Sequence, residues 1–199
     1  MARRGSYAKG IAKREEILST ALDVIARNGY RGASVKELAD AVGLSQAGLL
    51  HYFGSKEELF AEVLRMRDER DARSIDRTTG RSLDAFVDVV RGNTGVPGLV
   101  QLYAQLSVEA SDPAHPAHEY FVERYRTFRA GMADHLRTQQ DAGVVRADLD
   151  PDALAAVLAA AADGLQTQWM LDPDIDMAAH LRVLIDALDA PGTARDDTP

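Results

Sequence analysis

The chain has 199 residues, of which 46% are hydrophobic and 27% charged, as is typical of a globular protein with one large domain or a small module joined to a medium one. The absence of cysteine excludes disulfides, thiolate metal ligands and cysteine nucleophiles. The longest apolar stretch, residues 153–162, is far shorter than the roughly 20 residues that span a bilayer, so we expect a soluble, cytoplasmic protein with no membrane partner.

The formal net charge of −8 argues against nucleic-acid binding, but its distribution reverses this conclusion. Residues 1–67 hold 11 Lys and Arg against 8 Asp and Glu, whereas residues 68–199 hold 12 against 23. Five basic residues and no acid occur in the first fourteen positions: Arg3, Arg4, Lys9, Lys13 and Arg14. This pattern predicts a small anion-binding module on an acidic body. The basic cluster could follow phosphates as an arm, or it could be a solubilising tail.

The N-terminal segment predicts helices in close succession. Apolar residues at three- and four-residue spacing predict a first helix over about 8–28, which Gly29 ends in a left-handed conformation. Residues 34–37 read Ser-Val-Lys-Glu, a capping box that opens a short second helix. Gly43 then ends this helix in a tight turn.

Ser45 caps a third helix over 46 to about 53, and residues 55–58 form a second capping box that starts a long helix. Leu49 and Phe53 face the core of the module. Two short helices joined by a glycine turn after a longer support helix are the parts of a helix-turn-helix.

The third helix is short enough to lie in a major groove about 12 Å wide. Its outer face carries small or polar residues: Gln46, Ala47, Gly48 and His51. A glycine costs about 1 kcal/mol of helix propensity relative to alanine, which is understandable if this backbone approaches DNA. Tyr52 and Lys56 flank the end of the helix and could reach phosphates. Their alternatives are a core-edge aromatic and a solvated lysine.

The rest of the chain also follows a helical pattern. The predicted helices cover about 82–93, 98–110, 116–141, 151–171 and 177–188. The fold class is therefore all-α with about nine helices. Residues 1–55 are predicted to form a basic arm and a three-helix, helix-turn-helix DNA-binding domain, and residues 56–199 a helical domain for effector binding and dimerisation.

Residues 39–45 (ADAVGLS) and 49–59 (LLHYFGSKEEL) resemble the TetR family of bacterial transcriptional regulators. The specific resemblance covers about residues 8–66. It implies a homodimer that binds double-stranded, palindromic operator DNA, is released by a small-molecule effector, and acts as a repressor. By position, Ser34, Tyr52 and Lys56 would contact phosphate and residues 46–51 would face the bases. The candidate DNA-binding residues are Ser34, Lys36, Ser45, Gln46, Ala47, Gly48, His51, Tyr52 and Lys56.

Two positions depart from the family pattern. Leu50 stands where a second tyrosine is frequent and Gly48 where threonine is common. Both departures remove polar contacts, so the operator cannot be inferred from a relative. Residues 112–118 and 163–173 look like the C-terminal domain of the betaine-regulator subgroup, which implies a shared scaffold. Choline is not expected as the effector, because the chain has one Trp and quaternary ammonium sites use several aromatics.

The resemblance directs attention to two further sets of residues in the C-terminal part. The candidate effector pocket comprises Phe86, Tyr103, Phe121, Tyr125, Phe128, Gln168 and Trp169; the alternative is that most of these are ordinary core. The candidate dimer interface comprises Leu154, Leu158, Ala161, Leu165, Leu181, Leu184, Ile185 and Leu188. These apolar stripes would form a four-helix bundle with a second copy, or they pack only within one copy.

No metal, cofactor or catalytic residue is predicted. Four potential ligands occur close together, Asp112, His115, His118 and Glu119, but they form no clean ligand pattern, and His115 is better explained as an N-cap before Pro116. An enzyme acting on a hydrophobic small molecule is the alternative function. It lacks a convergent acid, base or nucleophile. A third reading is a helical interaction protein that has lost DNA binding.

Overall fold

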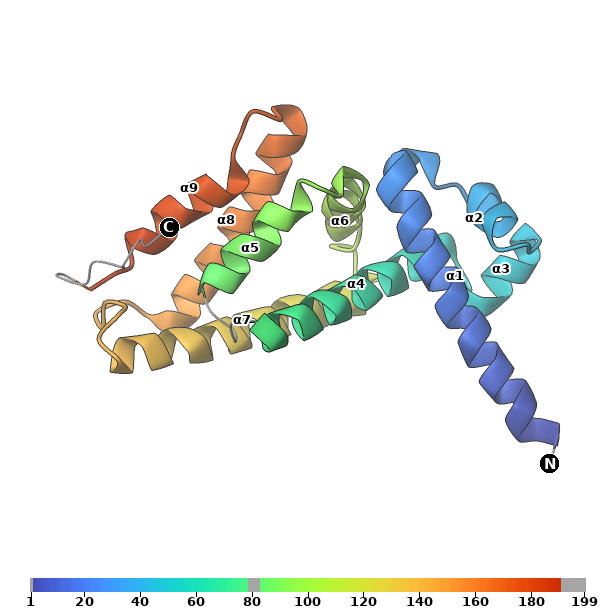
Figure 1. The fold of residues 1–199 in the computed structure, drawn as a ribbon, viewed down its shortest axis with the longest axis horizontal. Helices are drawn as coiled ribbons and strands as arrows, with labels where there is room; N and C mark the ends of the chain where they lie inside the picture. Colours follow the sequence, from blue (N-terminus) through green and yellow to red (C-terminus); the bar gives the residue numbers. More distant parts are fainter. Residues whose placement is uncertain (1, 79–82, 191–199) are drawn as a thin grey trace. The chain divides into compact units, whose positions relative to one another are not determined.

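The computed structural model describes residues 2–78 and 83–190, apart from the side chains of residues 2–8, 30, 31 and 73–78. Over these ranges the chain forms nine helices and no strand, which confirms the all-α prediction (Figure 1). In chain order the helices are α1 (Ala2–Gly32), α2 (Val35–Ala41), α3 (Gln46–Phe53), α4 (Lys56–Thr78), α5 (Leu83–Asn93), α6 (Pro97–Glu109), α7 (His118–Asp141), α8 (Pro151–Leu171) and α9 (Met177–Asp186). None of the described helices is long and apolar enough to cross a bilayer.

Two helix ends differ from the sequence-based expectation. Helix α1 begins at Ala2 rather than near residue 8, and it breaks at Gly29, where φ is +74° and ψ is 169°. The positive φ was predicted and suits glycine, but ψ is extended rather than left-handed helical. Helix α7 begins at His118, so Pro116 lies in the preceding turn. There the Ala117 N–H donates to Nδ1 of His115 (3.2 Å), a local capping contact.

The chain divides into two compact units. Unit 1 comprises residues 1–74 and 93–121, and unit 2 comprises residues 75–92 and 122–199. Helices α4 and α7 therefore contribute residues to both units. The predicted domain border after residue 55 does not coincide with the border between these two units. It concerns the division of functions along the chain and stays a prediction.

In unit 1, α2 and α3 lie together beside α1 (Figure 1). The largest fully buried side chains of this unit are Ile17, Ile25, Leu38, Leu49, Leu59, Phe60, Leu102 and Leu106. Helix α6 approaches α1 without side chains between them: a β-carbon at Gly98 would lie inside contact distance of the Ile25 carbonyl oxygen and 2.8 Å from Gly29 Cα. Glycine at residue 98 thus allows two backbones to touch.

The core of unit 2 brings α5, α7, α8 and α9 together. Its buried residues include Val87, Leu136, Ala155, Leu158, Met177, Leu181 and Ile185. After α9 the chain pairs with the segment that follows α7. The Arg146 N–H donates to the Leu188 carbonyl (2.9 Å), and the Ala190 N–H donates to the Val144 carbonyl (2.8 Å). These hydrogen bonds hold the end of α9 within the unit.

Half of the members of the predicted dimer stripes are buried within one copy. Leu158, Leu181, Ile185 and Leu188 belong to the core of unit 2. Leu154, Ala161, Leu165 and Leu184 are partly buried against the same core. Periodicity identified the apolar faces of α8 and α9 correctly, but these faces pack on neighbouring helices of unit 2. The four buried members fit the alternative that the stripes pack within one copy, and the dimer interface stays a prediction.

Candidate nucleic-acid interface

Helix α2 begins with a complete capping box. The Ser34 hydroxyl accepts the Glu37 N–H (3.1 Å), and the Ser34 N–H donates to Oε2 of Glu37 (2.9 Å). The hydrogen bonds from the Ser34 backbone and hydroxyl lower the pKa of Glu37 below its ordinary value. This stabilisation is therefore present above the ordinary carboxyl pKa and is lost as the pH falls through the lowered value. The predicted start of α2 is confirmed.

The turn between α2 and α3 is closed by the backbone and by a lysine from α1. Gly43 has φ +67°, and the Leu44 N–H donates to the Ala39 carbonyl (2.9 Å). Nζ of Lys13 donates to the Val42 carbonyl (3.1 Å) and to Glu16 (2.9 Å). Lys13, which the sequence placed in a basic cluster, thus supports the end of α2.

Arg14, also in that cluster, has its main contacts inside unit 1. Its Nη2 lies 2.8 Å from Oε2 of Glu62, and its guanidinium lies 4.9 Å from the centroid of the Phe53 ring. Arg14 therefore joins α1 to the end of α3 and to α4, rather than extending as a free arm. Lys9 is exposed, and the side chains of Arg3 and Arg4 lie outside the described residues.

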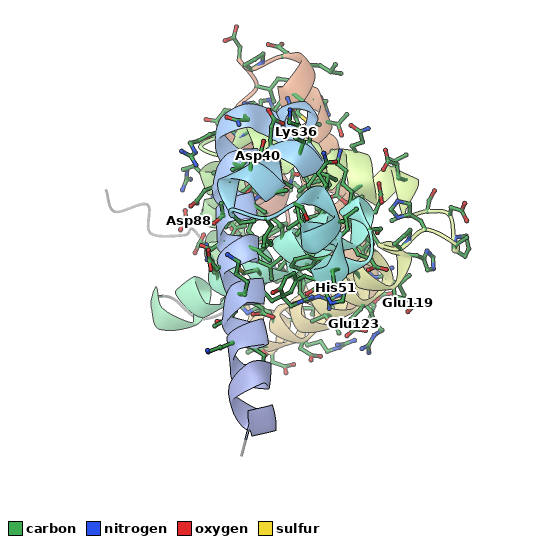
Figure 2. All side chains as sticks on the ribbon, turned by 90° about the vertical axis from the view of Figure 1, so that its right-hand side faces the viewer. Lys36, Asp40, His51, Asp88, Glu119 and Glu123 are labelled. Carbon is green, nitrogen blue, oxygen red and sulfur yellow. The ribbon has the colours of Figure 1, made fainter. Side chains whose placement is uncertain are left out.

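Helix α3 has the two faces that the sequence predicts. The Ser45 hydroxyl accepts the Gly48 N–H (3.0 Å) and caps the helix, while Leu49 and Phe53 are buried. The outward residues Gln46, Ala47 and His51 are exposed, and Gly48 is half-buried. Figure 2 shows α2 and α3 in front, with Lys36 labelled on α2 and His51 on α3. The helix thus presents a face of small or polar residues to solvent.

Gly48 adds no side chain to this face. A β-carbon there would lie 3.1 Å from Oγ of Ser45 and 3.9 Å from Cβ of Leu44. Its only near neighbours are thus the cap of its own helix and the preceding residue. Among the described residues, no other element lies within 4 Å of such a β-carbon.

The end of α3 and the start of α4 bring Tyr52 and Lys56 to the same region. Gly54 has φ +74° and its N–H donates to the Leu50 carbonyl (2.7 Å). The Ser55 hydroxyl then accepts the Glu58 N–H (3.0 Å), so the predicted cap on α4 is present. Tyr52 is half-buried with its ring edge-on to His51, and Nζ of Lys56 lies 5.0 Å from the Phe60 ring centroid. Each side chain is thus held by a ring beside it.

The seven candidate effector residues fall into two groups. Tyr103 and Phe121 are buried in unit 1, with ring centroids 5.6 Å apart. The other group lies in unit 2, where Phe86 and Phe128 have centroids 5.2 Å apart. The remaining members differ in exposure: Tyr125 and Trp169 are half-buried and Gln168 is exposed. The structure thus places Tyr103 and Phe121 in the core of unit 1, and Gln168 on the surface.

Two polar residues of α8 that the sequence analysis did not select lie inward. Asp163 is half-buried and its Oδ2 accepts the Tyr125 hydroxyl (2.6 Å). Gln166 is only 8% exposed. A signal was present in the sequence, because Asp163 and Gln166 follow the apolar stretch of residues 153–162 at three-residue spacing.

A capped, exposed helix after a tight turn, supported by a longer helix, defines a helix-turn-helix DNA-binding regulator. Residues 17–63 match the model of the bacterial regulatory proteins of the tetR family, and residues 102–190 match that of the BetI-type transcriptional repressor C-terminal domain. The chain belongs to the TetR family of transcriptional regulators. It is a ligand-responsive, DNA-binding repressor of this family, and the alternative of an enzyme is not supported.

Individual relatives agree over most of the chain. The HTH-type transcriptional repressor Rv1474c of Mycobacterium tuberculosis is 30% identical over 88% of this chain and 91% of its own. The HTH-type transcriptional repressor AcnR of Corynebacterium efficiens is 30% identical over 78% of this chain and 81% of its own. A transcriptional regulator from Saccharomonospora viridis, solved in complex with choline, is 28% identical with a TM-score of 0.70, covering 88% of this chain and 96% of that one.

Proposed function

We propose that the protein works in the cytoplasm as a homodimer on a palindromic operator, with one α3 in each of two successive major grooves. A small-molecule effector bound within residues 56–199 releases the DNA by favouring a dimer whose recognition helices are wrongly spaced. The observation that carries this proposal is the exposed outer face of α3. The required spacing of the two helices is about 34–36 Å.

The roles of the candidate residues follow from their positions. Gln46, Ala47, Gly48 and His51 lie on the outer face of α3, where they would meet base edges. The proposed phosphate contacts are made by Ser34, Lys36, Ser45, Tyr52 and Lys56. The N-termini of α2, α3 and α4 add to this set, because helix N-termini favour anions.

Helices α8 and α9 pack against each other within unit 2. Dimerisation is proposed to use the faces of these two helices that point away from the core of unit 2. Val157 and Leu171 on α8 are exposed, and Val183 on α9 is 71% exposed. In a two-fold dimer the same surface of both copies meets, so the exposed residues of one copy would be covered by those of the other. Four helices would then form a bundle. This proposed interface adds exposed residues to the predicted stripes, of which Leu158, Leu181, Ile185 and Leu188 are buried within one copy.

Lys56→Ala is expected to weaken binding to every duplex and to reduce the slope of log K against log salt concentration by about one per lost phosphate contact in each half-site. Gln46→Ala is expected instead to change the preferred sequence, because it removes a base contact. Gel-shift titrations with the DNA upstream of the protein's own gene measure both. Arg126→Ala, which removes an exposed cation paired with Glu123, is the control. An unchanged salt slope in Lys56→Ala would refute the phosphate assignment.

Ser45 allows capping to be separated from DNA contact. Ser45→Ala is expected to lower the free energy of unfolding by about 1 kcal/mol, because the Gly48 N–H loses its acceptor. Ser45→Asp keeps a capping oxygen, so stability is retained, but its negative charge repels phosphate and weakens operator binding. Chemical denaturation and gel shifts distinguish the two effects. Undiminished DNA binding by Ser45→Asp would remove Ser45 from the interface.

The effector can be sought by thermal shift, since a ligand that binds only the folded protein raises its melting temperature. Choline belongs in the set of compounds because a relative was solved with it. A compound that stabilises the protein is expected to weaken operator binding at the same concentration. A stabilising compound that leaves operator binding unchanged would not be the proposed effector.

A further inference from the structure

The buried face of α8 carries one amide. Ala155, Leu158 and Ala162 recur at helical spacing and belong to the core of unit 2. Gln166 continues the same face and is 8% exposed. Among the residues that the structure describes, the Gln166 side chain has no hydrogen-bond partner. Its oxygen and nitrogen are not among the fully enclosed, unpaired atoms of the described chain, so the amide reaches space that another molecule can touch.

The neighbours of Gln166 supply a polar pair and aromatic surface. One turn earlier, Asp163 accepts the Tyr125 hydroxyl at 2.6 Å. One turn later, Trp169 is half-buried against the core of unit 2, as is Phe86, whose ring contacts Phe128. All of these residues belong to unit 2. Gln166 therefore lies between a carboxylate–phenol pair and an indole on one side of α8.

An amide that is mostly buried and has no protein partner keeps few of its hydrogen bonds to water, which is unfavourable. A molecule that returns these hydrogen bonds is therefore bound preferentially. A primary amide offers a donor and an acceptor side by side, and a neutral amide or hydroxyl group can pair with both. A carboxylate can only accept. Helix α8 contains no Lys or Arg over its whole length, and Asp163 would repel an anion.

We propose that Gln166 is the hydrogen-bonding anchor of the effector site, and that the effector is an apolar molecule with a neutral amide or hydroxyl head. This inference rests on the proposed effector function of residues 56–199. It replaces Gln168, which is exposed, as the polar group beside Trp169.

The first test needs no ligand. Gln166→Leu removes the unpaired amide but keeps most of the side-chain volume, so it is expected to raise the melting temperature of the free protein by about 2–4 °C. Gln105→Leu is the matched control, because Gln105 is an exposed amide on α6 that donates to Glu109. It is expected to leave the melting temperature nearly unchanged. A melting temperature that falls in Gln166→Leu would show that the amide is already satisfied and would overturn the proposal.

The second test compares head groups on one six-carbon body: hexanamide, hexanoate and hexylamine. Trp169 is the only Trp of the chain and lies one turn from Gln166, so its fluorescence reports binding there. At millimolar concentrations, hexanamide is expected to give the largest saturable change in the wild type and to lose at least tenfold in affinity in Gln166→Leu. Stronger binding of hexanoate or hexylamine, equal binding by the variant, or no change with any compound would contradict the proposal.

A parallel gel shift separates this inference from the proposed function. Gln166→Leu is expected to bind operator DNA as the wild type does, because Gln166 belongs to unit 2, whereas α2 and α3 belong to unit 1. If the wild type binds hexanamide through Gln166 but binds no duplex, the proposed function fails and the site remains. If the wild type binds DNA but its binding of hexanamide does not depend on Gln166, this inference fails and the proposed function stands.

Discussion

A Gly98→Ala variant is expected to unfold at a clearly lower temperature than the wild type. The added β-carbon would overlap the Ile25 carbonyl oxygen and lie 2.8 Å from Gly29 Cα. Both obstacles are backbone atoms of α1, which cannot rotate away as a side chain can. Overpacking of this kind costs about 1–3 kcal/mol, and for a chain of this length each kcal/mol lowers the melting temperature by roughly 2–4 °C. Thermal unfolding followed by circular dichroism measures the change.

Gly92→Ala is the matched control and is expected to change stability in the opposite direction. Gly92 is exposed near the end of α5, and a β-carbon there meets nothing within 4 Å. Alanine is the better helix former by up to about 1 kcal/mol. If Gly98→Ala were as stable as Gly92→Ala, α6 would not approach α1 as closely as described, and the packing of unit 1 would need revision.

A Val183→Asp variant is expected to be monomeric and to lose operator affinity by a factor of about 100 or more, because the two half-sites are then no longer bound by one linked molecule. Val183 is 71% exposed on α9, so the substitution leaves the core of unit 2 intact. In a two-fold interface the new carboxylate occurs twice and loses its water. Sedimentation measures the oligomeric state, and gel shifts measure the affinity.

Val108→Asp controls for the introduced charge. Val108 has nearly the same exposure, 72%, but lies on α6, outside the proposed interface. We expect this variant to remain dimeric and to bind DNA normally. A dimeric Val183→Asp protein would exclude the outward face of α9 from the interface. A monomeric Val108→Asp protein would place the interface on α6 instead.

The sequence predicted best those features whose causes are local. The hydroxyl of Ser34 and the hydroxyl of Ser45 cap N–H groups three residues away, so residue type and spacing were sufficient to predict both helix starts. The positive φ at Gly29 and Gly43 also followed from local turn chemistry. The helix-turn-helix was therefore predictable before any tertiary contact was known.

Features that depend on distant partners were not predictable in this way. Lys13 contacts a carbonyl 29 residues away and Arg14 a carboxylate 48 residues away, so a count of basic residues could not show that both are engaged. The stripe containing Leu158 had the right period, but periodicity does not say which helix covers it. The burial of Gln166 was not predictable, because sequence alone does not show whether an amide on a largely apolar helix is buried.

The contacts of Arg14 have a consequence for how the DNA-reading surface could be controlled. One guanidinium from α1 lies over Phe53, the last residue of α3, and pairs with Glu62 on α4. A rotation of α4 about its own axis would move Glu62 away from Arg14 and so weaken the contact between the Arg14 guanidinium and the Phe53 ring. Regulation could thus act through the anchorage of the recognition helix, at its C-terminal end, with no change in the groove-facing side chains themselves.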